Sequence, residues 1–182
     1  MWEDENLVKV LKGNGVVVMP TDTLYGIVGT ARNLEVVERI YALRKRNPEK
    51  PCIILIGDIK ELQKFSIILT PEQKKVIADF STPTSFVLDC TDEKLSYLHR
   101  GSQTLAFRVP NPESLRALLL TVGPLVAPSA NPEGKSAAEN ISQAKAYFGD
   151  SVDLYMDAGT LKGNPSRLIK LHKDGSINIL RQ

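Results

Sequence analysis

The chain has 182 residues, of which 42% are hydrophobic and 24% charged, and this composition excludes an intrinsically disordered protein. A chain of this length buries roughly 70% of the surface that its unfolded form exposes, so it needs no disulfide or metal to fold. The formal net charge of +2 excludes a global field that would draw the protein onto nucleic acid or membrane. Any anion site must therefore come from local clustering of charge.

Two cysteines, Cys52 and Cys90, lack the spacing of a metal site, and we expect two reduced thiols in a reducing compartment. His99 and His172 are isolated, so we expect no metal site and assign both to packing or the surface. The N-terminus carries acidic residues where a secretory signal carries basic ones. The longest apolar run, 52–56, is far shorter than the roughly 20 residues of a membrane span. We expect a cytoplasmic protein that does not enter the membrane.

The apolar period alternates between helix-like and strand-like spacing along the chain. In the first half it predicts a helix over 7–11, a strand over 16–19, a helix from Asn33 to Arg46, a strand over 52–56, a helix over 58–64 and a helix that begins at Thr70. In the second half it predicts strands over 85–88 and 105–109, a helix over 111–121, a strand over 125–127, a helix over 141–148, a strand over 152–156 and a final hairpin over 168–180. We therefore expect one α/β domain over residues 1–182, a mixed, twisted sheet with flanking helices.

Polar side chains follow two of the predicted strands. The segment 20–26 places two threonines, an aspartate and a tyrosine between a proline and a glycine. The segment 128–132 places Ser129 and Asn131 two residues apart between two prolines, so both side chains can point the same way. Ordinary turn hydrogen bonding explains both segments, and so does a binding site at the strand ends; both interpretations stay open here.

Arginines mark the other two segments that stand out. Arg44 and Arg46 flank one residue, and an extended chain would put both guanidinium groups on one side, either as a solvated helix end or as a phosphate site. Arg108 shares a face of the strand over 105–109 with Thr104. If Arg108 is buried it needs an anionic partner, either a protein carboxylate or a ligand. Together, the four segments predict a site that positions and neutralises phosphates and carboxylates.

Five stretches also carry a family resemblance. They are PTDTLYGI, RKRNPEKP, TLAFRVP, PSANPEG and the C-terminal DAG…GNPSRLI…ILR. In order and spacing they resemble the YrdC/Sua5 family, the threonylcarbamoyl-AMP synthases of tRNA modification. The resemblance runs from Val8 to Arg181 and implies a twisted mixed α/β fold with a concave basic surface, in the short form of the family without an extra C-terminal domain.

The resemblance implies a nucleotidyltransferase that joins L-threonine, bicarbonate and ATP, with Mg²⁺ on the nucleotide, into L-threonylcarbamoyladenylate and pyrophosphate. A separate threonylcarbamoyl-transferase complex then modifies adenosine 37 of tRNAs that read codons beginning with A. The family also implies possible binding of tRNA or double-stranded RNA. In this reaction a carbamate attacks the α-phosphorus of ATP, so cations must neutralise two anions. The arginines of the polar segments described above could supply these cations.

Matching the family's motifs residue by residue implies roles for nine side chains. The catalytic set is Arg44, Arg46, Ser129 and Asn131. The threonine-binding set is Thr21, Arg108, Ser129 and Ser166. The ATP-binding set is Arg44, Arg46, Thr104, Asn131 and Arg181.

The chain departs from the family pattern in places. Arg44 stands where the family usually has lysine. The positive charge is kept, but a planar guanidinium group replaces a compact ammonium group. Asn47 replaces a usual proline, and Arg167 a usual threonine. Ser136 and Glu139 occupy a stretch that often supplies a hydroxyl to the nucleotide; here they match a capping box, so no contact is assigned.

Two other functions stay open. One is an RNA-binding module without chemistry, which the small net charge disfavours. The other is synthesis of carbamoyl-adenylate from carbamoyl phosphate, as in a related domain of hydrogenase-maturation proteins. The absence of a CxxC motif and of room for additional domains disfavours this second function.

Overall fold

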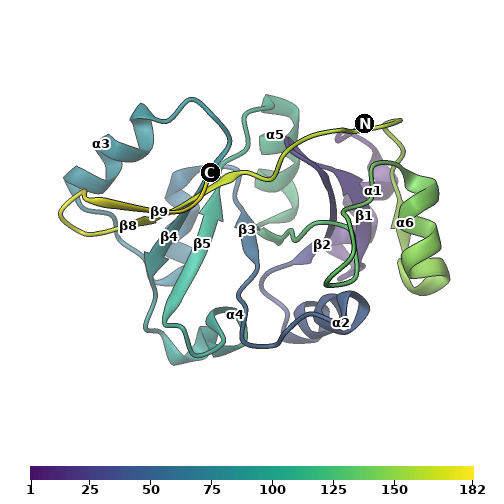
Figure 1. Cartoon of the computed structure of the whole chain (residues 1–182), viewed down its shortest axis with the longest axis horizontal. Coiled ribbons are helices and arrows are strands. Elements are labelled where there is room, and N and C mark those ends of the chain that lie inside the picture. The colour runs from purple at the N-terminus through teal and green to yellow at the C-terminus, as the bar shows by residue number, and fades with distance from the viewer.

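A computed structural model describes all 182 residues, and its nine strands form one mixed sheet in the order β7-β1-β2-β6-β3-β5-β4-β8-β9 (Figure 1). The strands are β1 (Val17–Pro20), β2 (Tyr25–Thr30), β3 (Ile53–Leu55), β4 (Thr84–Asp89), β5 (Thr104–Arg108), β6 (Leu125–Val126), β7 (Leu154–Tyr155), β8 (Arg167–Leu171) and β9 (Ile177–Arg181). The α-helices are α1 (Glu5–Lys12), α2 (Leu34–Arg44), α3 (Pro71–Asp79), α4 (Ser96–His99), α5 (Glu113–Val122) and α6 (Ile141–Phe148). Short 3₁₀ helices are η1 (Ile59–Phe65), η2 (Glu93–Leu95) and η3 (Gly149–Ser151).

The sheet mixes both pairing directions, which confirms the predicted fold class. Strands β1 and β2 are antiparallel, β3 and β5 are parallel, and β4 runs antiparallel to β5 but parallel to β8. The predicted C-terminal hairpin is also present, because β9 pairs antiparallel with β8. None of the helices is both long and apolar enough to cross a membrane.

Two apolar cores sandwich the sheet around β1, because this strand is buried on both of its faces. Val17 and Met19 pack in the core that contains α1 and α5, whereas Val18 packs in the core that contains α2 and α6. A strand covered on both sides reads as a continuous apolar run rather than an alternating one, which is why β1 was predictable.

Side-chain caps fix the starts of several predicted helices. Asn33 accepts hydrogen bonds from the amides of Glu35 and Val36 at the start of α2. Thr70 forms a capping box with Gln73 at the start of α3. The capping box predicted for Ser136 and Glu139 is wrong, because the cap of α6 lies four residues later than Ser136. Its cap is Asn140, whose side chain accepts from the amide of Gln143, and the side chain of Gln143 in turn accepts from the amide of Glu139.

The sequence analysis missed β2, and the start of α5 differs from its prediction. The polar segment after β1 is only a short turn, and Tyr25 begins a strand that pairs back onto β1. At α5, Pro112 occupies the cap position and no side chain caps the helix. Asn111 instead donates its side-chain amide to the carbonyl of Ser81.

Candidate active site

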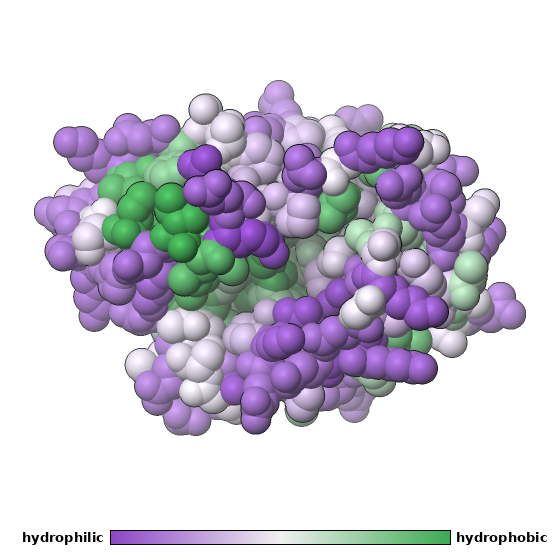
Figure 2. Space-filling view, in the orientation of Figure 1, coloured by the Kyte–Doolittle hydropathy of each residue, from purple (hydrophilic) through white to green (hydrophobic).

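A polar cavity of about 200 Å³ opens among segments that are far apart in the sequence. Its wall comes from the end of α2 and the segment after it, from β2, β3, β5, β8 and β9, and from the loops before β2, after β6 and before β8. Figure 2 shows this face hollowed near its centre, with apolar side chains gathered over β8 and β9 beside the hollow. The basic character expected for the concave surface stays a prediction.

Seven of the nine predicted site residues line this cavity. They are Thr21, Arg44, Arg46, Arg108, Ser129, Ser166 and Arg181. Another cavity, of about 230 Å³, is lined mainly by apolar side chains on the opposite face of β5 and contains none of the nine. The polar cavity is therefore the candidate active site.

The structure does not bring Thr104 or Asn131 to the cavity wall. Thr104 begins β5, and its hydroxyl lies 3.1 Å from that of Ser102. Asn131 is buried behind Arg44, and its side-chain amide donates to the carbonyls of Pro132 and Lys135. Their predicted contacts with ATP stay predictions.

Arg44 ends α2 and reaches the cavity from there. Its side chain is buried, its Nε donates to the Asn131 carbonyl at 2.9 Å, and its Nη1 has no hydrogen-bond partner. Burial lowers the pKa of this guanidinium, which means that its charge is poorly compensated by the protein. An anion in the cavity would relieve this cost.

Arg46 reaches the same cavity, although the chain between the two arginines is not extended. Lys45 has a left-handed backbone with φ 49°, so the chain turns sharply as it leaves α2. The Nε of Arg46 donates to the carbonyl of Lys50 at 3.0 Å and its Nη2 to that of Pro51 at 2.9 Å. Two backbone carbonyls thus hold its guanidinium at the cavity wall.

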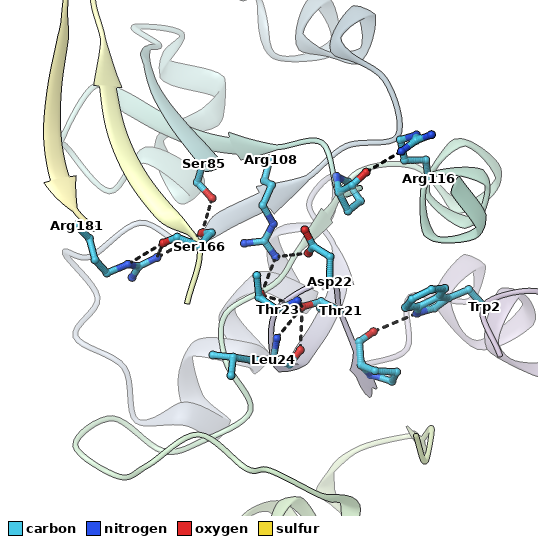
Figure 3. A network of polar contacts seen from close by, with 12 residues as sticks. Trp2, Thr21, Asp22, Thr23, Leu24, Ser85, Arg108, Arg116, Ser166 and Arg181 are labelled. Carbon is cyan, nitrogen blue, oxygen red and sulfur yellow. Dashed lines mark hydrogen bonds and ion pairs between the residues drawn. The ribbon is translucent and has the colours of Figure 1, made fainter. Parts of the chain in front are cut away.

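Arg108 has a protein carboxylate as one partner, but its Nε has no hydrogen-bond partner and the residue lines the cavity, so a ligand contact stays open beside the ion pair. Its Nη2 lies 2.9 Å from Oδ1 of Asp22, with side chains only 4% and 2% exposed (Figure 3). The same nitrogen lies 3.4 Å from the hydroxyl of Thr23. Burial lowers the pKa of the Arg108 guanidinium, and Asp22 opposes that shift. The sequence analysis counted Asp22 among the polar residues of the segment 20–26 but did not link it to Arg108, which is far away in the sequence.

Ser166 joins the C-terminal hairpin to the cavity wall. Its hydroxyl lies 2.9 Å from that of Ser85, a fully buried residue that the sequence analysis also missed. Arg181 donates from Nε and Nη2 to the Ser166 carbonyl at 3.0 and 2.8 Å (Figure 3). Strand β9 thereby fixes the end of the segment that precedes β8.

The segment 156–166 crosses over the turn that carries Thr21 and Thr23, and we call it the strap. The hydroxyl of Tyr25 donates to the Gly159 carbonyl at 2.9 Å and accepts from the Ala158 amide at 2.8 Å. A Cβ added to Gly163 would lie 2.0 Å from the Thr23 carbonyl oxygen. Only glycine therefore allows the strap to lie this close to the turn.

Comparison with known proteins decides the family. The Sua5/YciO/YrdC family model, described as telomere recombination, matches residues 9–182. The chain belongs to this family. Threonylcarbamoyl-AMP synthase of Marinobacter nauticus is 33% identical over 168 residues, which cover 89% of this chain and 87% of the relative. The protein of the same name from Idiomarina loihiensis is 31% identical over 160 residues, which cover 85% and 86%.

Solved structures share the fold. P. abyssi Sua5 complexed with L-threonine superposes with a TM-score of 0.86 at 25% identity. The match covers 97% of this chain and 52% of that protein, so this chain spans about half the length of P. abyssi Sua5. The family membership and the fold predicted from the five motifs are both confirmed.

Proposed function

We propose that this Sua5/YciO/YrdC-family protein is an L-threonylcarbamoyladenylate synthase that uses ATP, L-threonine and bicarbonate. The observation that carries the proposal is the convergence of four guanidinium groups with the hydroxyls of Ser129 and Ser166 on one cavity. The arginines come from the end of α2, the following turn, β5 and β9. Such a site suits a reaction in which two anions must meet.

The geometry suggests a division of labour within the cavity. Arg108 would bind the carboxylate of threonine, with the strap and Ser166 enclosing the amino acid. Arg44, whose Nη1 is buried without a partner, and Arg46 would bind the phosphates of ATP. Charge neutralisation by guanidinium forks then lets the threonine-derived carbamate approach the α-phosphorus. Because the carbamate is already an anion, the step needs no general base from the protein.

Magnesium would enter with the nucleotide. No carboxylate lines the cavity, and the one next to it, Asp22, is already paired with Arg108. Hydroxyl and guanidinium groups are poor ligands for Mg²⁺, which prefers carboxylates and phosphates. The protein residues therefore do not form a magnesium site of their own.

The product is a mixed anhydride of a carbamic acid and a phosphate. A separate threonylcarbamoyl-transferase complex would consume it to modify adenosine 37 of tRNA. We place both steps in the cytoplasm, with tRNA as a possible direct partner of this chain.

The test is pyrophosphate release by the purified protein with Mg²⁺. We expect release only when ATP, L-threonine and bicarbonate are all present, with nucleotide product that carries label from ¹⁴C-bicarbonate. Pyrophosphate release with carbamoyl phosphate in place of threonine and bicarbonate would instead favour synthesis of carbamoyl-adenylate. Folded protein that releases no pyrophosphate with any of these substrates would contradict the proposal.

The strap provides a second prediction. Gly163→Ala should push the strap away from Thr23 and raise the KM for threonine about tenfold, because small displacements of positioning groups are costly. The KM for ATP should change little. Lys162→Ala, at an exposed neighbouring position, is the matched control. An unchanged KM for threonine in the Gly163 variant would mean that the strap does not enclose this substrate.

A further inference from the structure

Glu133, in the loop after β6, contacts the segment 44–50, which carries Arg44, Arg46 and Lys50. Glu133 lies two residues beyond Asn131, and its backbone amide donates to the carbonyl of Arg44 at 2.7 Å. Its Oε1 lies 2.9 Å from Nζ of Lys50, and its Oε2 accepts the backbone N–H of Asn47. A single residue therefore contacts the first, middle and last residues of the segment 44–50.

This turn is what holds Arg46 against the cavity. The amide of Lys50 donates to the carbonyl of Asn47 at 3.2 Å, which closes the turn. The carbonyl of Lys50 then accepts from Nε of Arg46 at 3.0 Å and from the hydroxyl of Tyr41 at 2.8 Å. A displacement of the turn would move the acceptor that orients the Arg46 guanidinium.

The contact between Glu133 and Asn47 exists only because residue 47 is not proline. Proline has no N–H and fixes its own φ. A proline at position 47 would therefore restrict the backbone of the turn without needing a hydrogen-bond acceptor. In this chain Asn47 leaves that N–H free to donate, and the Glu133 carboxylate accepts it. The hydrogen bonds from Lys50 and from the Asn47 amide lower the pKa of the Glu133 carboxyl, so it is ionised at neutral pH.

We propose that Glu133 is a positioning residue for Arg46: by binding Asn47 and Lys50, its carboxylate holds the 47–50 turn in the shape that places the guanidinium at the phosphate-binding side of the cavity. The inference rests on the proposed function for the role of Arg46 in ATP binding. We call the contacts of Glu133 with Asn47 and Lys50 the clamp. Because the clamp concerns only the shape of the turn, it can be tested without measuring catalysis.

The kinetic test compares Glu133→Ala, Glu133→Gln and Lys50→Met. Loss of the acceptor in Glu133→Ala should raise the KM for ATP about fivefold, the value of one hydrogen bond, and leave the KM for threonine unchanged. Glu133→Gln keeps an acceptor and should lie between this variant and the parent. Lys50→Met removes only an exposed ion pair and should change the KM less than about twofold. Asp89→Ala, which removes an exposed carboxylate paired with Lys170 elsewhere on the sheet, is the matched control and should have no effect.

Rescue separates positioning from a general loss of structure. Adding Asn47→Pro to Glu133→Ala removes the N–H that lost its acceptor and restricts the turn directly. We expect the KM for ATP to return to within about twofold of the parent value. An unchanged KM for ATP in Glu133→Ala, or a raised KM that the added Asn47→Pro does not lower, would overturn the proposal.

Hydrogen exchange supplies the readout that does not depend on activity. The Asn47 amide should exchange about tenfold faster in Glu133→Ala than in the parent, because its acceptor is gone. If the parent shows no turnover, the proposed function fails while this measurement still tests the clamp. An Asn47 amide that exchanges equally fast in both proteins would overturn the inference.

Discussion

Replacing Arg108 by methionine is expected to lower the free energy of unfolding by about 3–5 kcal/mol, the largest stability effect that we expect from one substitution. The reason is its partner: the Asp22 carboxylate is 2% exposed, and neither of its oxygens accepts a hydrogen bond from any group other than Arg108. Without the guanidinium, the protein would bury an uncompensated charge. Urea denaturation monitored by circular dichroism measures the change.

The double variant Asp22→Asn with Arg108→Met controls for lost packing. Because the charge is removed together with its partner, we expect most of the stability to return. Lys170→Met breaks a pair whose carboxylate is half exposed, and it should cost about 1 kcal/mol or less. A loss below about 1 kcal/mol in Arg108→Met would show that the Arg108–Asp22 pair is not desolvated as the structure has it.

Replacing Arg46 by alanine is expected to lower kcat/KM for ATP by about 100-fold or more, because a charge that meets the phosphates is lost from a preorganised site. The free energy of unfolding should change by only about 1 kcal/mol, since Arg46 is partly exposed and donates to just two carbonyls. Steady-state kinetics and urea denaturation on the same preparation measure both quantities.

Arg46→Lys distinguishes charge from geometry. An ammonium group keeps the charge but cannot donate to both carbonyls and a phosphate as a flat fork does, so activity should be intermediate. If Arg46→Ala instead destabilises the protein strongly and leaves kcat/KM per folded molecule intact, Arg46 is a structural residue and the proposed phosphate site is wrong.

Much of the fold could be predicted because its signals are local. The apolar run of β1, the Asn33 cap of α2 and the Thr70 capping box are each contained in a few residues. Strand β2 escaped because its first residues, Tyr25 and Gly26, continue a polar turn, and its pairing with β1 is decided by contacts across the turn.

Seven of the nine predicted site residues line one cavity, but the contacts between them could not be predicted from the sequence. Motif matching placed Arg46 and Ser166 at the cavity, where both lie. It could not show that Asp22 neutralises Arg108, because that contact joins a turn before β2 to the end of β5. Nor could it show that the carbonyl of Asn131 accepts a hydrogen bond from Arg44; the place of Asn131 among the reacting groups stays a prediction.

The most direct test of the central claim is a crystal structure of the protein with L-threonine and a non-hydrolysable ATP analogue. We expect both ligands in the polar cavity, with the threonine carboxylate on Arg108 and the phosphates on Arg44 and Arg46. Threonine and nucleotide bound in separate regions, or phosphates that contact neither Arg44 nor Arg46, would contradict the account.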